Sequence, residues 1–295
     1  MLKRRTFRLE LRSRTLALGE RTLLMGVLNV TPDSFSDGGR FLDPRRAVEH
    51  ALEMERAGAD LLDIGGESTR PGSTAIPADM ELARILPVLE GLRRVLKIPI
   101  CVDTGKSEVA EAAITAGAQI INDVSGLRHD PRIAEAAAQQ GVPLILMHMR
   151  GEPKTMQKKP FARNVMMDVK QGLRAAIIRA RRAGVRKSQI IVDPGIGFGK
   201  SFEQNYELLR KLPEIAKFGY PLLVGTSRKG FLGATLARGG KSAPPNERLW
   251  ATAATVTASI LGGAHIVRVH DVAEMAQVAC VADCLLDAGK CRNFH

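Results

Sequence analysis

Short apolar runs alternate with longer amphipathic runs eight times along this chain. The short runs are rich in β-branched residues, as in buried parallel strands, and the longer runs have the pattern of helices. The expected strands are 23–30, 60–65, 98–103, 119–123, 143–148, 189–195, 221–226 and 265–270. Eight such repeats predict a closed parallel (β/α)8 barrel of the TIM-barrel class. They disfavour the alternative, a doubly wound open sheet.

The barrel accounts for most of the 295 residues, and no linker or shift in composition indicates a second domain. We expect one domain over residues 23–290, preceded by a short N-terminal strand or hairpin extension over residues 1–22. The extension is basic but lacks the continuous apolar stretch of a secretory signal. Since no apolar run approaches the roughly 18 residues needed to cross a bilayer, we expect a cytoplasmic protein without membrane contact.

The charge and cysteine content exclude few functions. The formal net charge is +12 and aromatic residues make up 4% of the chain. Without an RNA-binding, zinc-finger or helix-turn-helix signature, we expect no nucleic-acid partner, and the positive field suits a small anionic substrate. The four cysteines, Cys101, Cys280, Cys284 and Cys291, form no CxxC pair or metal-type cluster and imply no disulfide. Core packing is the expected role of Cys280 and Cys284, four apart in a predicted helix.

Polar side chains lie at the C-terminal ends of most predicted strands. These ends converge on one mouth of a βα barrel, where catalytic groups are placed. A single aspartate after a strand is usually a helix N-cap, but capping alone does not readily explain so many at corresponding places. The residues are Asn29, Asp63, Asp103, Asn122, Asp123, His148, Asp193, Arg268 and His270. Grouped carboxylates and amides suit a ring with several N–H donors and acceptors, and no nucleophile–base pair or zinc-type cluster accompanies them.

Two segments, 31–39 and 65–74, are rich in turn-forming residues, and we expect them to act as active-site lids. Arg70 in the second segment is placed to grip a diphosphate together with Arg268 and His270. Asn29 offers an oxygen ligand for Mg²⁺.

Two further motifs concern anions. The glycine-rich segment 193–200 lacks the spacing of a P-loop, so that interpretation fails. Ser227, Arg228 and Lys229 follow the seventh strand at an expected helix start, where an anion would meet Lys229 and backbone N–H groups. The alternative for these three residues is an ordinary basic surface patch.

Seven motifs between about residues 23 and 286, in order and one per βα unit, together resemble the dihydropteroate synthase family. They are GVLNVTPDSFSDGG, DIGGESTRPG, VDTGKSEVA, INDVSG, VDPGIGFGK, VGTSRKGFLG and HIVRVHDV. The resemblance implies a transferase of folate biosynthesis that condenses 6-hydroxymethyl-7,8-dihydropterin diphosphate with 4-aminobenzoate and releases pyrophosphate. It also implies Mg²⁺ as cofactor, sulfonamides as inhibitors and a homodimer formed through the late helices.

The same resemblance implies roles for individual residues. The pterin site would contain Asp103, Asn122, Met147, Asp193, Gly225, Lys229 and Arg268. The diphosphate site would contain Asn29, Thr69, Arg70, Arg268 and His270, with Asn29 binding Mg²⁺. The aminobenzoate pocket would contain Phe35, Pro71, Phe198 and Lys229. The catalytic group would be Asn29, Arg70, Lys229 and Arg268.

The sequence departs from the family pattern at three places. Gly105 stands where many relatives carry a larger residue, Gly230 stands where some carry serine, and segment 160–168 lacks a common Tyr and Asp. We expect these changes to affect affinity rather than reaction type.

Three other functions are alternatives to this prediction. A pterin-binding methyltransferase needs no diphosphate site, so the long first loop and Lys229 argue against it. A paralogue without catalysis is disfavoured because Asn29, Arg70 and Arg268 are retained. A nucleic-acid-binding barrel rests on charge alone and is the weakest of the three.

Overall fold

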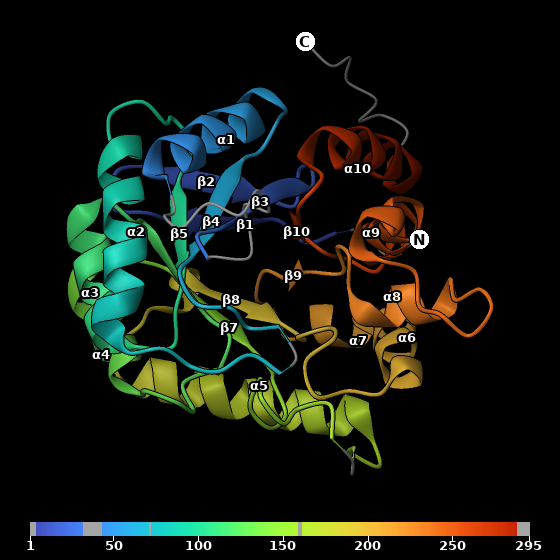
Figure 1. Cartoon of the computed structure of the whole chain (residues 1–295). Coiled ribbons are helices and arrows are strands. Elements are labelled where there is room, and N and C mark those ends of the chain that lie inside the picture. The colour runs from blue at the N-terminus through green and yellow to red at the C-terminus, as the bar shows by residue number, and fades with distance from the viewer. Residues whose placement is uncertain (1–3, 32–42, 71, 159–160, 288–295) are drawn as a thin grey trace.

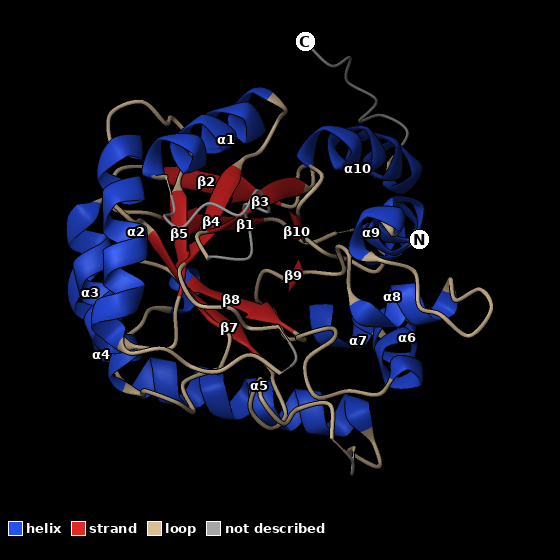
Figure 2. Ribbon diagram, in the orientation of Figure 1, coloured by secondary structure: helices blue, strands red, loops and turns tan. Residues whose placement is uncertain are grey.

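The computed structural model of the chain describes residues 4–31, 43–70, 72–158 and 161–287. In this part of the chain, eight parallel strands form a central sheet with helices around it (Figures 1 and 2). The strands are β3 (Leu23–Asn29), β4 (Leu61–Gly65), β5 (Ile100–Asp103), β6 (Ile120–Asp123), β7 (Leu144–Met147), β8 (Ile190–Asp193), β9 (Leu223–Val224) and β10 (Ile266–Val269). The helices are α1 (Pro44–Arg56), α2 (Ala78–Leu92), α3 (Ser107–Ala116), α4 (Arg132–Gln140), α5 (Val165–Arg182), α6 (Phe202–Arg210), α7 (Leu212–Ala216), α8 (Gly230–Thr235), α9 (Leu249–Leu261) and α10 (Val272–Leu286), with 3-10 turns η1 (Lys187–Gln189) and η2 (Pro245–Glu247).

The strand order confirms the barrel. Neighbouring strands run β8-β7-β6-β5-β4-β3-β10-β9, all in parallel pairs. A parallel bridge between Val192 in β8 and Leu222, just before β9, joins the two ends of this order. The sheet is therefore a closed βα barrel rather than the open doubly wound alternative.

Local sequence sets several helix ends. Asn164 and Ser201 accept hydrogen bonds from backbone N–H groups in the first turns of α5 and α6, which would otherwise lack partners. Helices α3 and α4 end at Gly117 and Gly141, both in the left-handed conformation that favours glycine. These signals are readable in the sequence and explain why most expected helices appear where the pattern places them.

One helix expected from the sequence is divided into two in the structure. The run 201–219 has a continuous helical pattern, but the structure divides it into α6 and α7 at Lys211. Pro213 lies in the first turn of α7, where its missing N–H is tolerated, whereas in the middle of a helix it would remove a hydrogen bond. Helix α8, which follows Lys229, is too short to give a periodic signal.

The core has two main layers. The larger cluster fills the space between the strands and the surrounding helices. The second fills the barrel interior and includes Leu9, Leu11 and Leu18 from an N-terminal antiparallel hairpin of β1 (Phe7–Glu10) and β2 (Thr15–Leu18). The hairpin side chains thus pack with residues such as Leu23 at the start of the barrel strands. The hairpin closes the end of the barrel opposite the polar strand ends.

Polar contacts hold the N-terminal segment against the last helix. The Arg4 guanidinium lies 2.8 Å from the Asp283 carboxylate on α10, and it also donates to the Thr22 hydroxyl at 2.7 Å. The backbone N–H of Thr22 donates to the same carboxylate at 2.6 Å.

Within the described residues, no helix is both long and apolar enough to cross a membrane.

We predict that Leu18→Ala destabilises the whole barrel. Leu18 is fully buried among barrel-interior side chains, and truncation of such a leucine costs about 2–5 kcal/mol because a cavity remains. Thermal and urea unfolding measure this loss. Arg8→Ala is the matched control on the exposed face of β1 and should change stability by less than about 0.5 kcal/mol. A Leu18→Ala effect as small as the control would show that the hairpin folds separately from the barrel.

Candidate active site

The C-terminal parts of the barrel strands carry six predicted residues toward the same end of the barrel. In the strand register Gly65 faces Asp103, Asp103 faces Asn122, and Met147 faces Asp193. Arg268 lies on β10, and Asn29 is the last residue of β3. The barrel therefore collects residues from distant parts of the chain around a single mouth, as the sequence predicts.

Arg268 is the centre of this group. Its Nε donates to Asp63 Oδ2 at 2.6 Å and its Nη2 donates to Asp103 Oδ2 at 3.2 Å. Asn122 Nδ2 donates to the same Asp63 oxygen at 3.1 Å. Asp63 is fully buried, so its charge depends on these two donors. Sequence reasoning placed Asp63 at a strand end but gave it no role, and the structure shows that it anchors Arg268.

These contacts shift the ionisation of both partners. Burial, reinforced by the nearby Asp63 carboxylate, raises the pKa of Asp103. Burial alone would lower the pKa of the Arg268 guanidinium, but Asp63 and Asp103 raise it instead. The arginine is therefore permanently charged, whereas Asp103 is able to present a proton to a ligand.

Asp193 lies across the mouth from this group. Its Oδ1 accepts a hydrogen bond from the Gly195 N–H at 2.7 Å, which fixes the direction of the carboxylate. Burial raises the pKa of Asp193 to about 6, although the Gly195 hydrogen bond and the positive Lys229 oppose the shift. A buried carboxylate with free acceptor capacity suits a ligand edge that offers N–H donors.

Lys229 and Phe198 lie together. The Lys229 ammonium is 3.9 Å from the centroid of the Phe198 ring, a cation–π contact. Burial and the charge of Arg268 lower the pKa of Lys229 to about 8, so its ammonium form dominates at neutral pH. Gly197 leaves room for the lysine stem, since a Cβ there would lie 3.0 Å from Lys229 Cδ. The structure thus unites two residues predicted for the aminobenzoate pocket.

The Ser-Arg-Lys motif ties the loop after β9 to the loop after β10. The Ser227 hydroxyl accepts a hydrogen bond from the His270 backbone N–H at 3.1 Å and lies 3.0 Å from His270 Nδ1. Arg228, in a left-handed conformation, pairs with Asp271. Burial, together with the charge of Arg268, lowers the pKa of His270 to about 3. His270 is therefore neutral, and it offers an N–H donor rather than a positive charge.

Three of the five predicted diphosphate residues line one cavity, and Thr69 and Arg268 are not part of its lining. About 740 Å³ of space beside β3, α1 and α10 is lined in part by Asn29, Arg70 and His270. Arg70 is exposed and belongs to the loop after β4, which docks on the loop after β7 through Gly72 N–H and Pro153 O at 3.0 Å. Thr69, its neighbour, is partly buried. The cavity brings cationic and amide groups together at the edge of the mouth.

Met147 and Gly225, predicted for the pterin site, both lie at the barrel mouth. Met147 is buried and packs with Phe198 in a small cluster, and Gly225 lies against Arg268, whose Cβ would be 3.6 Å from an added Cβ. Phe35 and Pro71 lie outside the described residues, as does most of the first predicted lid, 31–39.

The three departures from the family pattern have different surroundings. A Cβ at Gly105 would lie 3.5 Å from His129 Nδ1, so a larger residue would contact that ring. A Cβ at Gly230 would meet open space. The segment 160–168 does contain an aspartate, Asp168, so the expected lack of Asp there is wrong. It is only partly a loop, because α5 begins at Val165 and includes Asp168 in its first turn.

The chain is similar to known proteins in both sequence and fold. A sequence model of the family described as "Pterin binding enzyme" matches residues 25–270. The chain belongs to this family. A dihydropteroate synthase from Synechocystis sp. is 49% identical to this pterin-binding enzyme over 267 residues, which cover 90% of this chain and 91% of the relative.

Solved structures of dihydropteroate synthases have the same fold as this chain. The dihydropteroate synthase of Yersinia pestis in complex with a sulfonamide drug has a TM-score of 0.88 and 42% identity, covering 96% of this chain and 100% of that one. The Xanthomonas albilineans enzyme with 4-aminobenzoic acid also has a TM-score of 0.88 and 42% identity, covering 96% of this chain and 99% of that one. The pterin-binding enzyme described here thus matches these relatives over almost the full length of both chains.

We predict that Asp193→Asn separates stability from binding. The folded protein raises the pKa of Asp193 to about 6, so wild-type stability from this group falls as pH rises between about 4 and 6. The asparagine variant lacks that loss, so relative to wild type it should gain up to about 3 kcal/mol by pH 7. Affinity for a pterin should fall about 10- to 100-fold, because the amide offers a donor to ring donors.

Unfolding measured from about pH 4.5 to 7.5 and fluorescence titration with a pterin check both parts. Asp130→Asn is the control. Although partial burial acts in the opposite direction, hydrogen bonds from Arg132 and Ser107 lower the pKa of Asp130, so its effect on stability should be flat over this range. Unchanged pterin affinity in the Asp193 variant would contradict the assignment.

Proposed function

We propose that this chain catalyses the dihydropteroate synthase reaction, in which 6-hydroxymethyl-7,8-dihydropterin diphosphate and 4-aminobenzoate give 7,8-dihydropteroate and pyrophosphate. The observation that carries this proposal is the set of polar groups at the barrel mouth, where the buried Asp193 and the half-buried Lys229 accompany the buried Asp103 and Asn122 and the half-buried Arg268. The similarity to enzymes of this name over at least 90% of the chain supports it.

The polar groups match the edges of a pterin ring. The Asp193 carboxylate accepts from the 2-amino group and the adjacent ring N–H, and Lys229 donates to the ring carbonyl. Asp103 and Asn122, on neighbouring strands, hydrogen-bond to the other ring edge. The planar Arg268 guanidinium, fixed by two carboxylates, packs on the ring face.

The diphosphate belongs beside this ring site. Arg70 supplies charge from the β4 loop, and Arg268 and His270 supply donors from the end of β10. Thr69 adds a hydroxyl from the same loop as Arg70. Since His270 is neutral, its role is hydrogen bonding, and the charge on the departing pyrophosphate is met by the arginines.

The donor set fits Mg²⁺ only as a shared site. Within the described residues, no group of three or more His, Cys, Asp or Glu side chains is arranged to hold a metal ion. Asn29 lines the cavity with Arg70 and His270, and Mg²⁺ is commonly held by one or two protein oxygens together with substrate phosphate and water. We therefore propose Asn29 as its protein ligand. The ion would neutralise charge on the diphosphate.

The residues then act mainly by position. The aminobenzoate nitrogen forms a bond to the exocyclic methylene carbon of the pterin as the carbon–oxygen bond to the diphosphate breaks, and the amine loses a proton. Phe198 and the Lys229 ammonium form one wall of the aminobenzoate pocket, where the lysine meets the carboxylate. Phe35 and Pro71 remain predicted members of that pocket.

Two further expectations concern the whole protein. A homodimer through α9 and α10 is supported by the exposed apolar side chains Trp250, Val281 and Leu285 on these adjacent helices. The expected cytoplasmic location stays a prediction.

The direct test is pyrophosphate release from the pterin diphosphate, with and without 4-aminobenzoate. We expect release that depends on aminobenzoate and matches the dihydropteroate formed one for one. Lys229→Gln should lower this activity by about 10-fold or more, since it removes the charge that meets both substrates. A pterin-binding methyltransferase would bind pterin without releasing pyrophosphate, and that result would refute the proposal.

Sulfonamides should compete with 4-aminobenzoate. They resemble it in shape, and the wall formed by Phe198 and Lys229 is present in this chain. Initial rates measured over a range of both compounds give the inhibition pattern. Added aminobenzoate should restore the full rate at every sulfonamide concentration. Inhibition that aminobenzoate does not relieve would place the sulfonamide outside the proposed pocket.

A further inference from the structure

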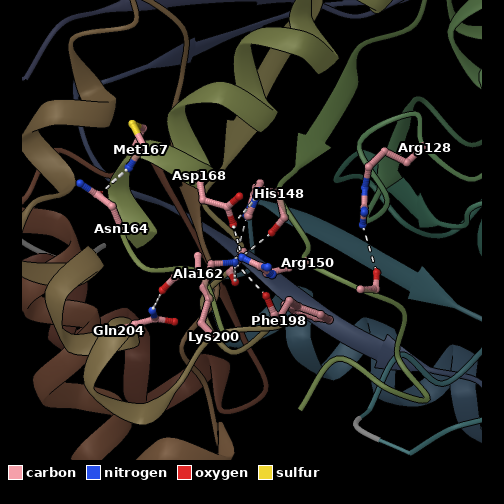
Figure 3. Close-up of polar contacts among 12 residues, drawn as sticks. Arg128, His148, Arg150, Ala162, Asn164, Met167, Asp168, Phe198, Lys200 and Gln204 are labelled. Carbon is pink, nitrogen blue, oxygen red and sulfur yellow. Dashed lines mark hydrogen bonds and ion pairs between the residues drawn. The ribbon is translucent and has the colours of Figure 1, made fainter. Parts of the chain in front are cut away.

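Lys200 is a charged side chain that lies almost entirely inside the protein, with 1% of its surface exposed. It ends the glycine-rich segment that begins at Asp193, and the proposed reaction gives it no task. Figure 3 shows its ammonium among polar atoms from His148 and Phe198, with Asp168 and Arg150 nearby. A buried ammonium is tolerated only where hydrogen-bond acceptors replace water, so its surroundings identify its role.

Three backbone carbonyls face the Lys200 ammonium. Its Nζ lies 2.8 Å from Gly195 O, 2.9 Å from Phe198 O and 3.1 Å from His148 O. The fourth neighbour is His148 Nδ1 at 3.2 Å. An ammonium group donates three hydrogen bonds, whereas a water molecule donates two, so lysine supplies more of the donors that these four acceptors need.

The histidine adapts to the lysine. Burial and the charge of Lys200 lower the pKa of His148, so the ring is neutral and its Nδ1 accepts from the ammonium. The proton is then on Nε2, which lies 3.6 Å from the Asp168 carboxylate on α5. Gly172 on the same helix leaves space for this ring, because a Cβ there would come within 2.4 Å of His148 Cδ2.

The carbonyls belong to two segments that are pressed together. A Cβ at Gly195 would lie 1.9 Å from His148 O, and one at Gly199 would lie 2.1 Å from Arg150 O. Both glycines have left-handed φ angles, 66° and 64°. The ammonium therefore joins the loop after β8 to the loop after β7 where only glycine permits their approach.

The opposite side of the same loop forms the active site. Gly195, whose carbonyl faces Lys200, uses its N–H to orient the Asp193 carboxylate at 2.7 Å. Phe198, whose carbonyl also faces Lys200, presents its ring to Lys229 at 3.9 Å. One buried lysine thus holds the backbone behind two residues that belong to two different substrate sites. Burial lowers the pKa of Lys200 to about 7, and the surrounding acceptors favour its ammonium form.

We propose that Lys200 is a positioning residue, whose buried ammonium fixes residues 194–199 so that Asp193 and Phe198 take their places in the pterin and aminobenzoate sites. It touches neither substrate. The inference deepens the proposed function and rests on it for the naming of the two sites. The diphosphate residues Arg70 and His270 lie on other loops, and neither is among the hydrogen-bond partners of Lys200.

The test is Lys200→Met, which keeps an unbranched side chain one atom shorter than lysine and removes its donors. Affinity for 6-hydroxymethylpterin should fall about 10-fold or more, and KM for 4-aminobenzoate should rise by a similar factor. Affinity for inorganic pyrophosphate, measured by calorimetry, should stay within about twofold of wild type. Lys217→Met, at an exposed position, is the matched control and should change none of the three.

Parallel losses for pterin and pyrophosphate would mean that Lys200 is needed only for folding and would overturn the proposal. Unchanged pterin affinity would overturn it as well. The pterin and pyrophosphate titrations require no turnover, unlike the KM measurement. An inactive wild type would therefore refute the proposed reaction while these two titrations still tested the role of Lys200.

Lys200→Ala offers a second route if the methionine variant does not fold. The atoms removed correspond to n-propylammonium, so this ion, present during purification and titration, should restore pterin affinity. Tetramethylammonium carries the same charge without N–H donors and should not restore it. Equal effects of the two ions would show that hydrogen bonding to the carbonyls is not what positions the loop.

Discussion

A guanidinium held between two carboxylates determines the centre of the mouth. Arg268 contacts Asp63 and Asp103, and Asn122 completes the group through Asp63. None of these charges is tolerable alone in a buried setting, so each residue depends on the others for its ionisation and direction. A closed barrel is what brings β4, β5, β6 and β10 close enough for this arrangement.

The mouth is built from two buried cationic systems that work differently. Arg268 faces the proposed pterin ring and is neutralised by side-chain carboxylates. Lys200 faces away from it. Among the described residues its hydrogen-bond partners are carbonyls and an imidazole, and no carboxylate lies within hydrogen-bonding distance. The first presents charge to a ligand, while the second stabilises backbone geometry behind it.

Burial also sets which groups around the mouth are charged at neutral pH. Burial raises the pKa of the Asp193 carboxyl group to about 6 and lowers the pKa of the Lys229 ammonium to about 8. His270 is neutral between two loops that Ser227 and the Arg228–Asp271 pair join. The site therefore combines fixed charge, titratable carboxylates and neutral donors, a combination suited to binding an aromatic ring and an anionic leaving group together.

The sequence by itself determined the barrel, the strand ends that carry polar residues and the family, because period, length and motif order are local properties of the chain. It did not determine the break at Lys211, where Pro213 favours a new helix start over a continuous one. It also gave no role to Asp63 or Lys200. Their partners, Arg268 for the first and His148 for the second, are distant in sequence, and only the lateral order of the strands in the folded sheet brings a buried charge within reach of the groups that satisfy it.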